Sequence, residues 1–248
     1  MLAFRERGSI LTTRVTAGQD DLGHIASYSI PEAAHYLRIP STTLRSWVLG
    51  RAFPTKDGRR FAEPPIAIAD RKGHQLSFVN LIEAHVLWAI RRKYDFPLQT
   101  VRRALRFLSD KLGSSHPLAT RRFETDGVNL FVPELGDLIN ITREGQLAMR
   151  EMLAAHLKRI EWSDRGEPVR LYPFTRKDAT DEPRSVVIDP HISFGRPVLV
   201  GSGIPTALIA ERYKAGETMD ELAKDYERAR ADIEEAVRCE LELHTQAA

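Results

Sequence analysis

The histidines, cysteine and acidic residues of this chain form no recognisable catalytic or metal-binding arrangement, and its polar and basic residues are spaced as in binding motifs. The eight histidines include no pair at helical spacing, and Cys-x-x-Cys and His-Glu-x-x-His motifs are missing. The single cysteine, Cys239, cannot form an internal disulfide. Glu240 and Glu242 follow it, so it lacks the electropositive surroundings of a reactive thiol. We therefore expect no catalytic residue, no metal and no cofactor.

The segment Ser41–Leu49 carries side chains suited to reading DNA. Placed as the second helix of a helix-turn-helix, it would enter the major groove, while Leu44 and Trp47 fix it to its own core. The residues expected to face outward and contact DNA are Thr42, Thr43, Arg45 and Ser46. Arg45 is the first candidate for a base or phosphate contact.

Local signals predict the two helices that position these residues. Ser29 can cap the first helix, and Glu32 places negative charge where the helix dipole favours it. Pro40 disfavours helical geometry in the residue before it and so ends that helix. Ser41 or Thr42 would then cap the second helix, which completes a helix-turn-helix.

A charged hairpin is predicted to follow. Apolar residues alternate at 66–68 and again at 76–78, on either side of a charged, glycine-containing tip at 70–74. This pattern is typical of the wing of a winged helix, with Arg71 and Lys72 at its tip. Lys56, Arg59 and Arg60 lie in an insertion before it and could be a second basic contact or only a solvated loop.

Residues 28–90 resemble the DNA-binding domain of the MerR-like winged-helix family. The Leu-Arg-x-Trp step at 44–47, the following wing and the helix beginning at Asn80 occur in the order of that family. The resemblance implies a dimer on a palindromic site, with Arg71 and Lys72 near phosphate. The long insertion at 51–65 is a departure from the family pattern.

The charge of the chain is divided unevenly between its two halves. Residues 1–116 contain 18 Lys and Arg against 10 Asp and Glu, a net charge of +8, whereas residues 117–248 contain 18 against 24, a net charge of −6. Cationic surface attracts phosphate and anionic surface repels it, so the two halves are expected to bind different partners.

The middle of the chain, 117–183, is expected to form a small α+β unit. We predict a hairpin over Phe123–Val132 that turns at Asp126-Gly127, then a helix over Gln146–Ile160 and a strand over Val169–Phe174. The polar stretch Arg176–Arg184 is the best candidate for a linker.

The C-terminal segment is rich in glycine turns and short amphipathic helices. It contains Asp189-Pro190, then Gly195-Arg196-Pro197-Val198 and Gly201-Ser202-Gly203-Ile204-Pro205, and later Tyr213, Gly216 and Tyr226. Over 188–241 it resembles domain of unknown function 433, whose members look like antitoxins. Together with the MerR-like head, the arrangement resembles the longer VapB-type antitoxins, encoded beside a toxin with a PIN-like ribonuclease domain.

The resemblance implies an antitoxin that also binds operator DNA as a homodimer to regulate its own operon. We expect contact with the ribonuclease toxin at His191, Arg196, Gly201, Ile204, Tyr213 and Tyr226. From Arg184 onward the net charge is −4, which suits a nuclease with a cationic RNA-binding channel. The alternatives are a MerR-like regulator whose middle unit binds a small effector, with no toxin partner, and a sequence-neutral nucleic-acid binder.

The predicted fold class is mainly α with small β elements (α+β). It comprises a flexible tail (1–27), a winged helix-turn-helix with its following helices (28–116), a small α+β unit with a linker (117–183) and a helix-turn-helix-like three-helix module (184–248). The composition, with 42% hydrophobic and 28% charged residues, is that of a globular protein, and no apolar run is long enough to cross a membrane. We expect a cytoplasmic location.

Overall fold

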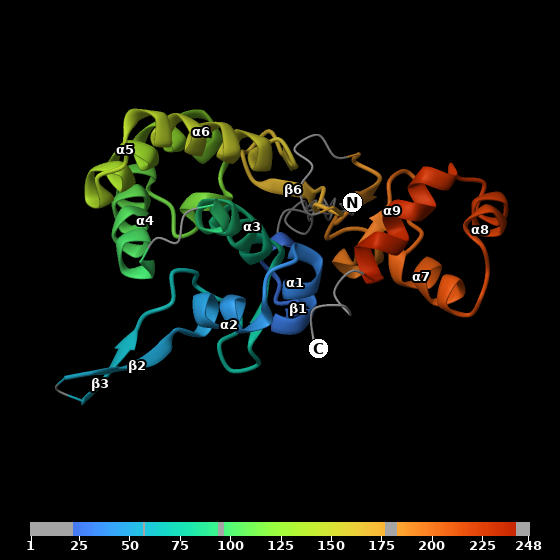
Figure 1. Cartoon of the computed structure of the whole chain (residues 1–248), viewed down its shortest axis with the longest axis horizontal. Coiled ribbons are helices and arrows are strands. Elements are labelled where there is room, and N and C mark those ends of the chain that lie inside the picture. Colours follow the sequence, from blue (N-terminus) through green and yellow to red (C-terminus); the bar gives the residue numbers. More distant parts are fainter. Residues whose placement is uncertain (1–21, 57, 94–96, 177–182, 242–248) are drawn as a thin grey trace, which may run out of the picture.

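The computed structural model describes residues 22–56, 58–93, 97–176 and 183–241. These residues are mainly helical, with four antiparallel sheets of two strands each, which confirms the predicted fold class. In Figure 1, α3–α6 lie at one end of the molecule, α7–α9 lie at the other, and α1 lies between them. Most of the predicted N-terminal tail and most of the predicted linker fall outside the described residues. Of the helices described, none combines the length and apolar content needed to cross a bilayer.

The first two helices form the predicted helix-turn-helix, and a capping box begins the first. Helix α1 spans Ile30–Leu37. The Ser29 hydroxyl accepts a hydrogen bond from the Glu32 backbone N–H (3.3 Å), and a Glu32 carboxylate oxygen accepts one from the Ser29 backbone N–H (3.0 Å). The helix ends at Arg38, which adopts a left-handed conformation with φ of 53°.

The start of α2 (Ser41–Leu49) differs from the prediction. Its N-cap residue is Pro40, and no side chain caps it, so the predicted cap by Ser41 or Thr42 is wrong. Packing holds the helix instead, because Leu44, Trp47 and Val48 are almost completely buried.

A hairpin follows α2 directly, in the segment that looked like an insertion. Strands β2 (Arg51–Thr55) and β3 (Gly58–Ala62) pair from Arg51↔Ala62 to Thr55↔Gly58. Figure 1 shows this hairpin extending away from the body of the molecule. The longer hairpin is therefore at 51–62, whereas the one predicted at 66–78 is reduced to a single bridge between Asp70 and Gln75.

Residues 66–77 form a loop that is pinned to the core. Among the described residues, its two arms meet only at the Asp70–Gln75 bridge, and β4 (Gln75–Leu76) pairs with β1 (Tyr28–Ser29) instead. The buried Asn80 fixes the loop from inside: its side-chain oxygen accepts from the backbone N–H of Ala69 (2.9 Å) and Ser77 (3.1 Å), and its nitrogen donates to the Ala67 carbonyl (2.9 Å).

Four longer helices form the main core with α1 and α2. They are α3 (Phe78–Lys93), α4 (Leu98–Leu112), α5 (Val128–Ile139) and α6 (Arg143–Leu157). Helix α4 begins after Pro97, its N-cap residue, and ends at Gly113, which is left-handed. The buried residues on both sides of His116 belong to one continuous hydrophobic cluster, which reaches from Tyr28 to Ile188.

The predicted hairpin at 123–132 is wrong, because this segment is helical. A π-helical turn at Phe123–Gly127 runs into α5. Phe123 and Phe131 are both fully buried and meet edge to face with their ring centroids 6.1 Å apart. The eight-residue spacing brings both rings to one face of a helix, and the free energy of burying them outweighs the turn preference of Asp126-Gly127.

Short strands connect the main core to the C-terminal module. Strand β5 (Ile160–Trp162) pairs with β6 (Pro168–Leu171), and β7 (Val186–Val187) pairs with β8 (Val198–Leu199). An isolated bridge between Leu171 and Ile188 joins the two pairs.

The C-terminal module packs α7 (Thr206–Lys214), α8 (Met219–Asp225) and α9 (Arg230–Leu241) around a second core. The buried residues of that core are Val186, Leu199, Ile209, Leu222, Ile233, Ala236, Val237 and Cys239. A capping box begins α8, since the Thr218 hydroxyl and backbone N–H both donate to the Glu221 carboxylate at 2.8 Å. Cys239 is buried in this core.

Candidate DNA-binding and protein-binding sites

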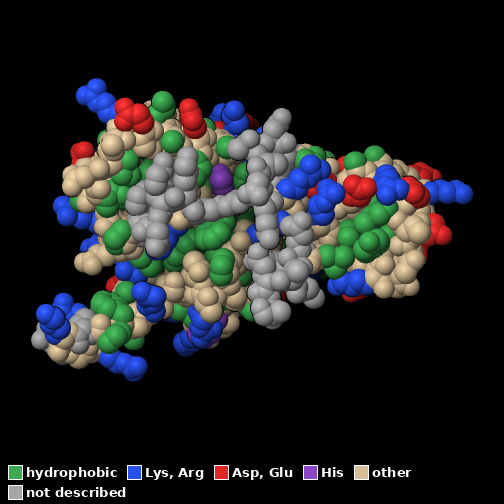
Figure 2. Space-filling model, viewed as in Figure 1, with side chains coloured by type: hydrophobic (Ala, Val, Ile, Leu, Met, Phe, Trp, Pro, Cys, Tyr) green, Lys and Arg blue, Asp and Glu red, His purple; other side chains and the backbone are tan. Residues whose placement is uncertain are grey.

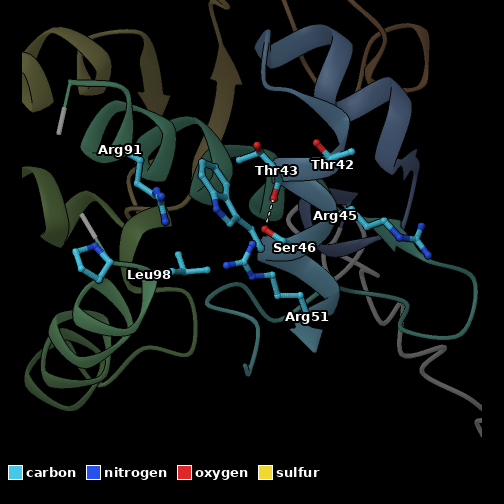
Figure 3. Close-up of a pocket in the computed structure, with 10 residues that line it drawn as sticks. Thr42, Thr43, Arg45, Ser46, Arg51, Arg91 and Leu98 are labelled. Atoms are coloured by element: carbon cyan, nitrogen blue, oxygen red, sulfur yellow. Dashed lines mark hydrogen bonds between the residues drawn. The ribbon is translucent and has the colours of Figure 1, made fainter. Parts of the chain in front are cut away.

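The four residues predicted to face DNA from α2 lie around one cavity. Thr42, Thr43, Arg45 and Ser46 border a space of about 710 Å³. Two cations from other elements, Arg51 of β2 and Arg91 of α3, border it too, together with Pro97 and Leu98 at the start of α4. In Figure 3, Arg51 and Arg91 lie on one side of α2, and Arg45 points away from them.

The exposed residues of α2 are Ser41, Thr42 and Arg45, and Thr42 and Arg45 form a ridge because they lie one helical turn apart. Thr43 and Ser46 are half-buried, and the Ser46 hydroxyl donates to the Thr43 carbonyl at 2.7 Å. That bond occupies the only proton of Ser46, so Ser46 can still accept a hydrogen bond but has none to give to a phosphate. Thr42 and Arg45 are therefore better placed as donors than Ser46.

Two further basic segments lie near the helix-turn-helix. Lys56, Arg59 and Arg60 are exposed on the β2–β3 hairpin, which appears as a cluster of Lys and Arg side chains at the lower left of Figure 2. Arg71 and Lys72 are also exposed, but they sit in a tight turn where Asp70 Oδ1 accepts from the backbone N–H of Lys72 (2.9 Å) and Gly73 (3.0 Å). The hairpin cations extend further from the core, and their turn signal, Asp57-Gly58, was visible in the sequence.

Two of the residues expected to contact the toxin are occupied by contacts within the chain. The Arg196 guanidinium lies 3.1 Å from the Glu32 carboxylate of α1. His191 is exposed, with its Nδ1 atom 3.1 Å from the Asp189 carboxylate. Arg196 thus helps to hold the C-terminal module on the head.

The other four predicted residues divide into packed and accessible ones. Ile204 and Tyr226 pack against the second core, and the Arg212 guanidinium lies 5.0 Å from the centre of the Tyr226 ring. Gly201 and Tyr213 are exposed. The accessible members of the predicted set are therefore His191, Arg196, Gly201 and Tyr213.

The most exposed large apolar residue described, Phe194, was missed by the sequence analysis. Its side chain is 92% exposed, and its backbone is left-handed, with φ of 56°. Val200 and Leu208 are also exposed in this module, and Figure 2 shows hydrophobic side chains gathered on its surface. Such apolar exposure on a folded module is typical of a protein-binding surface. The only sign of this exposed residue in the sequence is that an aromatic residue directly precedes a glycine, Gly195.

Some of the acidic residues of the module are paired with its own arginines, and the net charge of −4 already counts both partners. Asp220 pairs with Arg230 at 2.6 Å, and Asp225 pairs with Arg212 at 2.5 Å. Both carboxylates are thus balanced by arginines of the same module. Exposed ion pairs of this kind contribute little free energy, whereas exposed large apolar side chains such as Phe194 are typical of surfaces that bind other proteins.

Neither metal ligation nor thiol chemistry finds support in the described residues. They contain no cluster of three or more His, Cys, Asp or Glu that could hold a metal ion. Burial raises the pKa of the Cys239 thiol to about 12, which leaves it protonated and unreactive near neutral pH.

Comparisons with known proteins match both ends of the chain. Residues 26–105 match a family model described as "Putative DNA-binding HTH domain", and residues 186–238 match "Protein of unknown function (DUF433)". The chain is 31% identical over 217 residues to "Putative antitoxin VapB45" of Mycobacterium tuberculosis (strain ATCC 25618 / H37Rv), covering 80% of this chain and 87% of that one. The crystal structure of Rv2018 from M. tuberculosis superposes with a TM-score of 0.64 at 28% identity, over 86% of this chain and 98% of that one.

Proposed function

Since the chain belongs to the family of VapB-type antitoxins, we propose that it neutralises a ribonuclease toxin with a PIN-like domain and binds operator DNA as a homodimer to regulate its own operon. Neutralisation would work by occlusion, with no reaction catalysed by this chain. The observation that supports this best is the separation of two exposed chemistries on one molecule. Cations surround α2 at the head, and large apolar side chains are exposed on the C-terminal module.

The DNA-binding half of the proposal rests on α2 and the cations beside it. Thr42 and Arg45 form an exposed ridge, and the β2–β3 hairpin carries Lys56, Arg59 and Arg60 to one side. A helix that reads base edges while neighbouring cations hold the phosphates is the usual division of roles in a winged helix-turn-helix. Binding should therefore weaken steeply with salt.

This half is tested by anisotropy titration of the full-length protein with a duplex taken from upstream of its own gene. Arg45→Ala should lower the affinity about tenfold, the cost of one charged hydrogen bond. Arg103→Ala, which removes an exposed arginine from α4, is the control and should change little. Salt-independent binding by the parent would contradict the proposed mode.

The toxin-binding half rests on Phe194. A large aromatic side chain held almost fully in water, on a left-handed backbone, costs free energy that the module recovers only when a partner covers it. Gly201 and Tyr213, also accessible, would lie toward the edge of the same contact.

This half is tested by co-expressing the full chain with the product of the adjacent reading frame and measuring co-purification and RNA cleavage. Phe194→Ser should release the partner and restore cleavage. Leu147→Ser, which removes a 58% exposed leucine from α6, is the matched control and should leave the complex intact. An adjacent product with no nuclease activity, or one that does not co-purify, would contradict the proposal.

A further inference from the structure

A cavity of about 300 Å³ lies between the N-terminal elements β1 and α1 and the C-terminal module. Tyr28 of β1 and Tyr36 of α1 border it and are buried, so they form its floor. Ile25 and Phe194 border it and are exposed, so they form its rim. A concave space between two parts of a chain, with mostly apolar walls and a few polar groups, is typical of a small-molecule site.

Tyr28 brings an unpaired hydroxyl to this cavity. Only 3% of the residue is exposed, and among the residues that the structure describes nothing hydrogen-bonds to its hydroxyl. Within the same part of the chain, the polar side-chain atoms that are both unpaired and closed to solvent belong to Arg102 and Trp162, so the Tyr28 oxygen is open to the cavity that Tyr28 borders. A buried tyrosine hydroxyl usually has a partner, and this one is therefore a donor without an acceptor. Burial raises the pKa of Tyr28 above its usual range, which keeps the hydroxyl protonated.

The two charged residues that border the cavity, Glu32 and Arg196, differ in their remaining hydrogen-bonding capacity. Glu32 Oε2 accepts from the Ser29 backbone N–H (3.0 Å) and hydroxyl (2.7 Å), and Glu32 Oε1 accepts from Arg196 Nη1 (3.1 Å). Both oxygens of Glu32 are thus occupied. Arg196 uses Nη1 in this contact, and a guanidinium has further donors on Nε and Nη2. Its side chain is 59% exposed, so these donors can reach a ligand.

The unused donors of the cavity lie close together. A Cβ atom on Gly195, the residue before Arg196, would lie 2.0 Å from the Tyr28 hydroxyl oxygen. Arg196 and the Tyr28 hydroxyl can therefore both donate to one acceptor group. A guanidinium matches the two oxygens of a carboxylate, whereas the second charge of a phosphate would be repelled by Glu32 beside it.

The volume and the rim indicate the rest of the ligand. A cavity of about 150 Å³ can hold a benzene ring, so a cavity of about 300 Å³ has room for a ring and a short acid chain. We propose that this cavity binds a small carboxylic acid with an apolar body. Arg196 and the Tyr28 hydroxyl would hold the carboxylate, and the body would lie against Ile25 and Phe194.

Such a ligand would also weaken binding of the toxin, a step that rests on the proposed function. Phe194 borders the cavity and is the residue proposed to contact the toxin. An acid that lies against Phe194 covers apolar surface that the toxin would use. The two partners should therefore each lower the affinity of the chain for the other by the same factor.

The first experiment measures thermal unfolding of the full chain with millimolar phenylacetate, phenylacetamide, phenethylamine or acetate at equal ionic strength. Phenylacetate should raise the unfolding temperature of the parent. Phenylacetamide and phenethylamine, which share its ring but lack its negative charge, should raise the temperature less. Acetate, which lacks the ring, should leave it unchanged.

Tyr28→Phe removes only the unpaired hydroxyl. Without ligand this variant should unfold at the same or a higher temperature than the parent, because it loses a buried polar group that has no partner. Its affinity for phenylacetate, taken from the dependence of the shift on concentration, should fall roughly three- to tenfold. Tyr213→Phe, which changes an exposed tyrosine of α7 outside the cavity, is the matched control and should bind as the parent does.

Arg196→Gln should abolish the preference for the acid over the amide, because it removes the cation that recognises the carboxylate. Arg103→Gln, which removes an exposed arginine of α4, should keep the preference. If Arg196→Gln fails to fold, Tyr28→Phe and its Tyr213→Phe control still decide whether the hydroxyl holds the acid.

The second experiment adds phenylacetate or phenylacetamide to the complex of the full chain with the product of the adjacent reading frame. The acid should release the partner from the parent at a lower concentration than the amide does. The complex with Tyr28→Phe should need more acid for the same release.

Several results would overturn the inference. Equal shifts with the acid, the amide and the amine, or no shift with any of them, would exclude the acid site. A phenylacetate shift that both Tyr28→Phe and Arg196→Gln retain in full would place the ligand elsewhere. A complex that phenylacetate leaves intact, although it binds the free chain, would refute the competition with the toxin. If no complex forms, the proposed function fails, and the thermal shifts still decide the site.

Discussion

Arg38 donates a hydrogen bond of 2.7 Å from its Nη2 atom to the backbone carbonyl of Arg238. Arg38 lies in the turn between the two helices of the helix-turn-helix, and Arg238 lies in the last turn of α9. Carbonyls at the end of a helix lack helical partners and carry the negative end of the dipole, which a guanidinium complements. The turn before α2 is therefore bonded directly to the C-terminal module.

Arg38→Met should loosen this contact. The variant leaves a helix-end carbonyl without its charged donor, and we expect a loss of about 1–3 kcal/mol in the free energy of unfolding, measured by urea denaturation. Arg71→Met, which removes an arginine from the exposed loop, is the control and should lie within about 0.5 kcal/mol of the parent. Equal stabilities of the two variants would show that the bond contributes nothing.

Gly195 should tolerate no side chain, because it packs against Tyr28. It has φ of 75°, and a Cβ atom there would lie 2.0 Å from the Tyr28 hydroxyl oxygen. Gly201 has φ of 71° with no atom within 4 Å of its Cβ position, so it shares only the backbone strain. Gly201→Ala should cost about 1–2 kcal/mol, and Gly195→Ala roughly 1–3 kcal/mol more. Thermal or urea unfolding measures the difference, and equal costs would contradict the packing.

His85 should make stability depend on pH. Its ring stacks on Phe174 with centroids 5.7 Å apart, and burial lowers its pKa to about 3 from 6.5. Between these values the unfolded chain binds a proton that the folded chain does not. The stabilisation is complete above pH 6.5 and is lost as the pH falls, at up to about 1.4 kcal/mol per pH unit.

Comparing the parent with His85→Gln isolates the contribution of His85, because the other titrating groups are the same in both proteins and their effects on stability largely cancel in the difference. The variant should lose less stability than the parent between pH 6.5 and pH 4, as measured by urea denaturation. His74→Asn, which removes an exposed histidine from a left-handed position that Asn tolerates, should follow the parent. An identical pH profile for His85→Gln and the parent would refute the assignment.

Removing cations from the β2–β3 hairpin should weaken DNA binding more than removing cations from the loop at 70–74. Alanine at both Arg59 and Arg60 should reduce duplex affinity more than alanine at both Arg71 and Lys72, since the hairpin extends from the core while the loop is pinned by Asn80. Both double variants remove two charges, so non-specific screening affects them alike. Anisotropy titration at one fixed salt concentration compares them, and a larger loss for the loop variant would restore the wing predicted at 70–74.

Helix ends were the most predictable part of the fold, because their causes are local. Ser29 with Glu32 and Thr218 with Glu221 each satisfy backbone groups within three residues. Gly113 ends α4 for the same reason, since glycine alone takes the left-handed cap at little cost. The cap predicted at Ser41 or Thr42 failed because burial of Leu44 and Trp47 is sufficient to hold α2.

The same dipeptide, Asp-Gly, occurs in two different backbone structures in this chain, so its local preference does not decide the structure. At Asp57-Gly58 the flanking residues pair as a hairpin, from Thr55↔Gly58 outward. At Asp126-Gly127 the same dipeptide lies in helix, because Phe123 and Phe131 must both reach the core. A dipeptide sets only a preference of the backbone, and burial of large side chains overrides it.

The sequence by itself determined the start of α1, the charge division, the helix-turn-helix and the family of the C-terminal module, because these depend on neighbouring residues and short motifs. Only the tertiary structure decided that Arg196 of the module pairs with Glu32 of α1, that Phe194 is left in water, and that Arg51 and Arg91 border one cavity beside α2. Each of these facts depends on residues far apart in the chain that are brought together by packing. The conformational preferences of neighbouring residues do not set the distances between such residues. Burial of the two hydrophobic cores sets them.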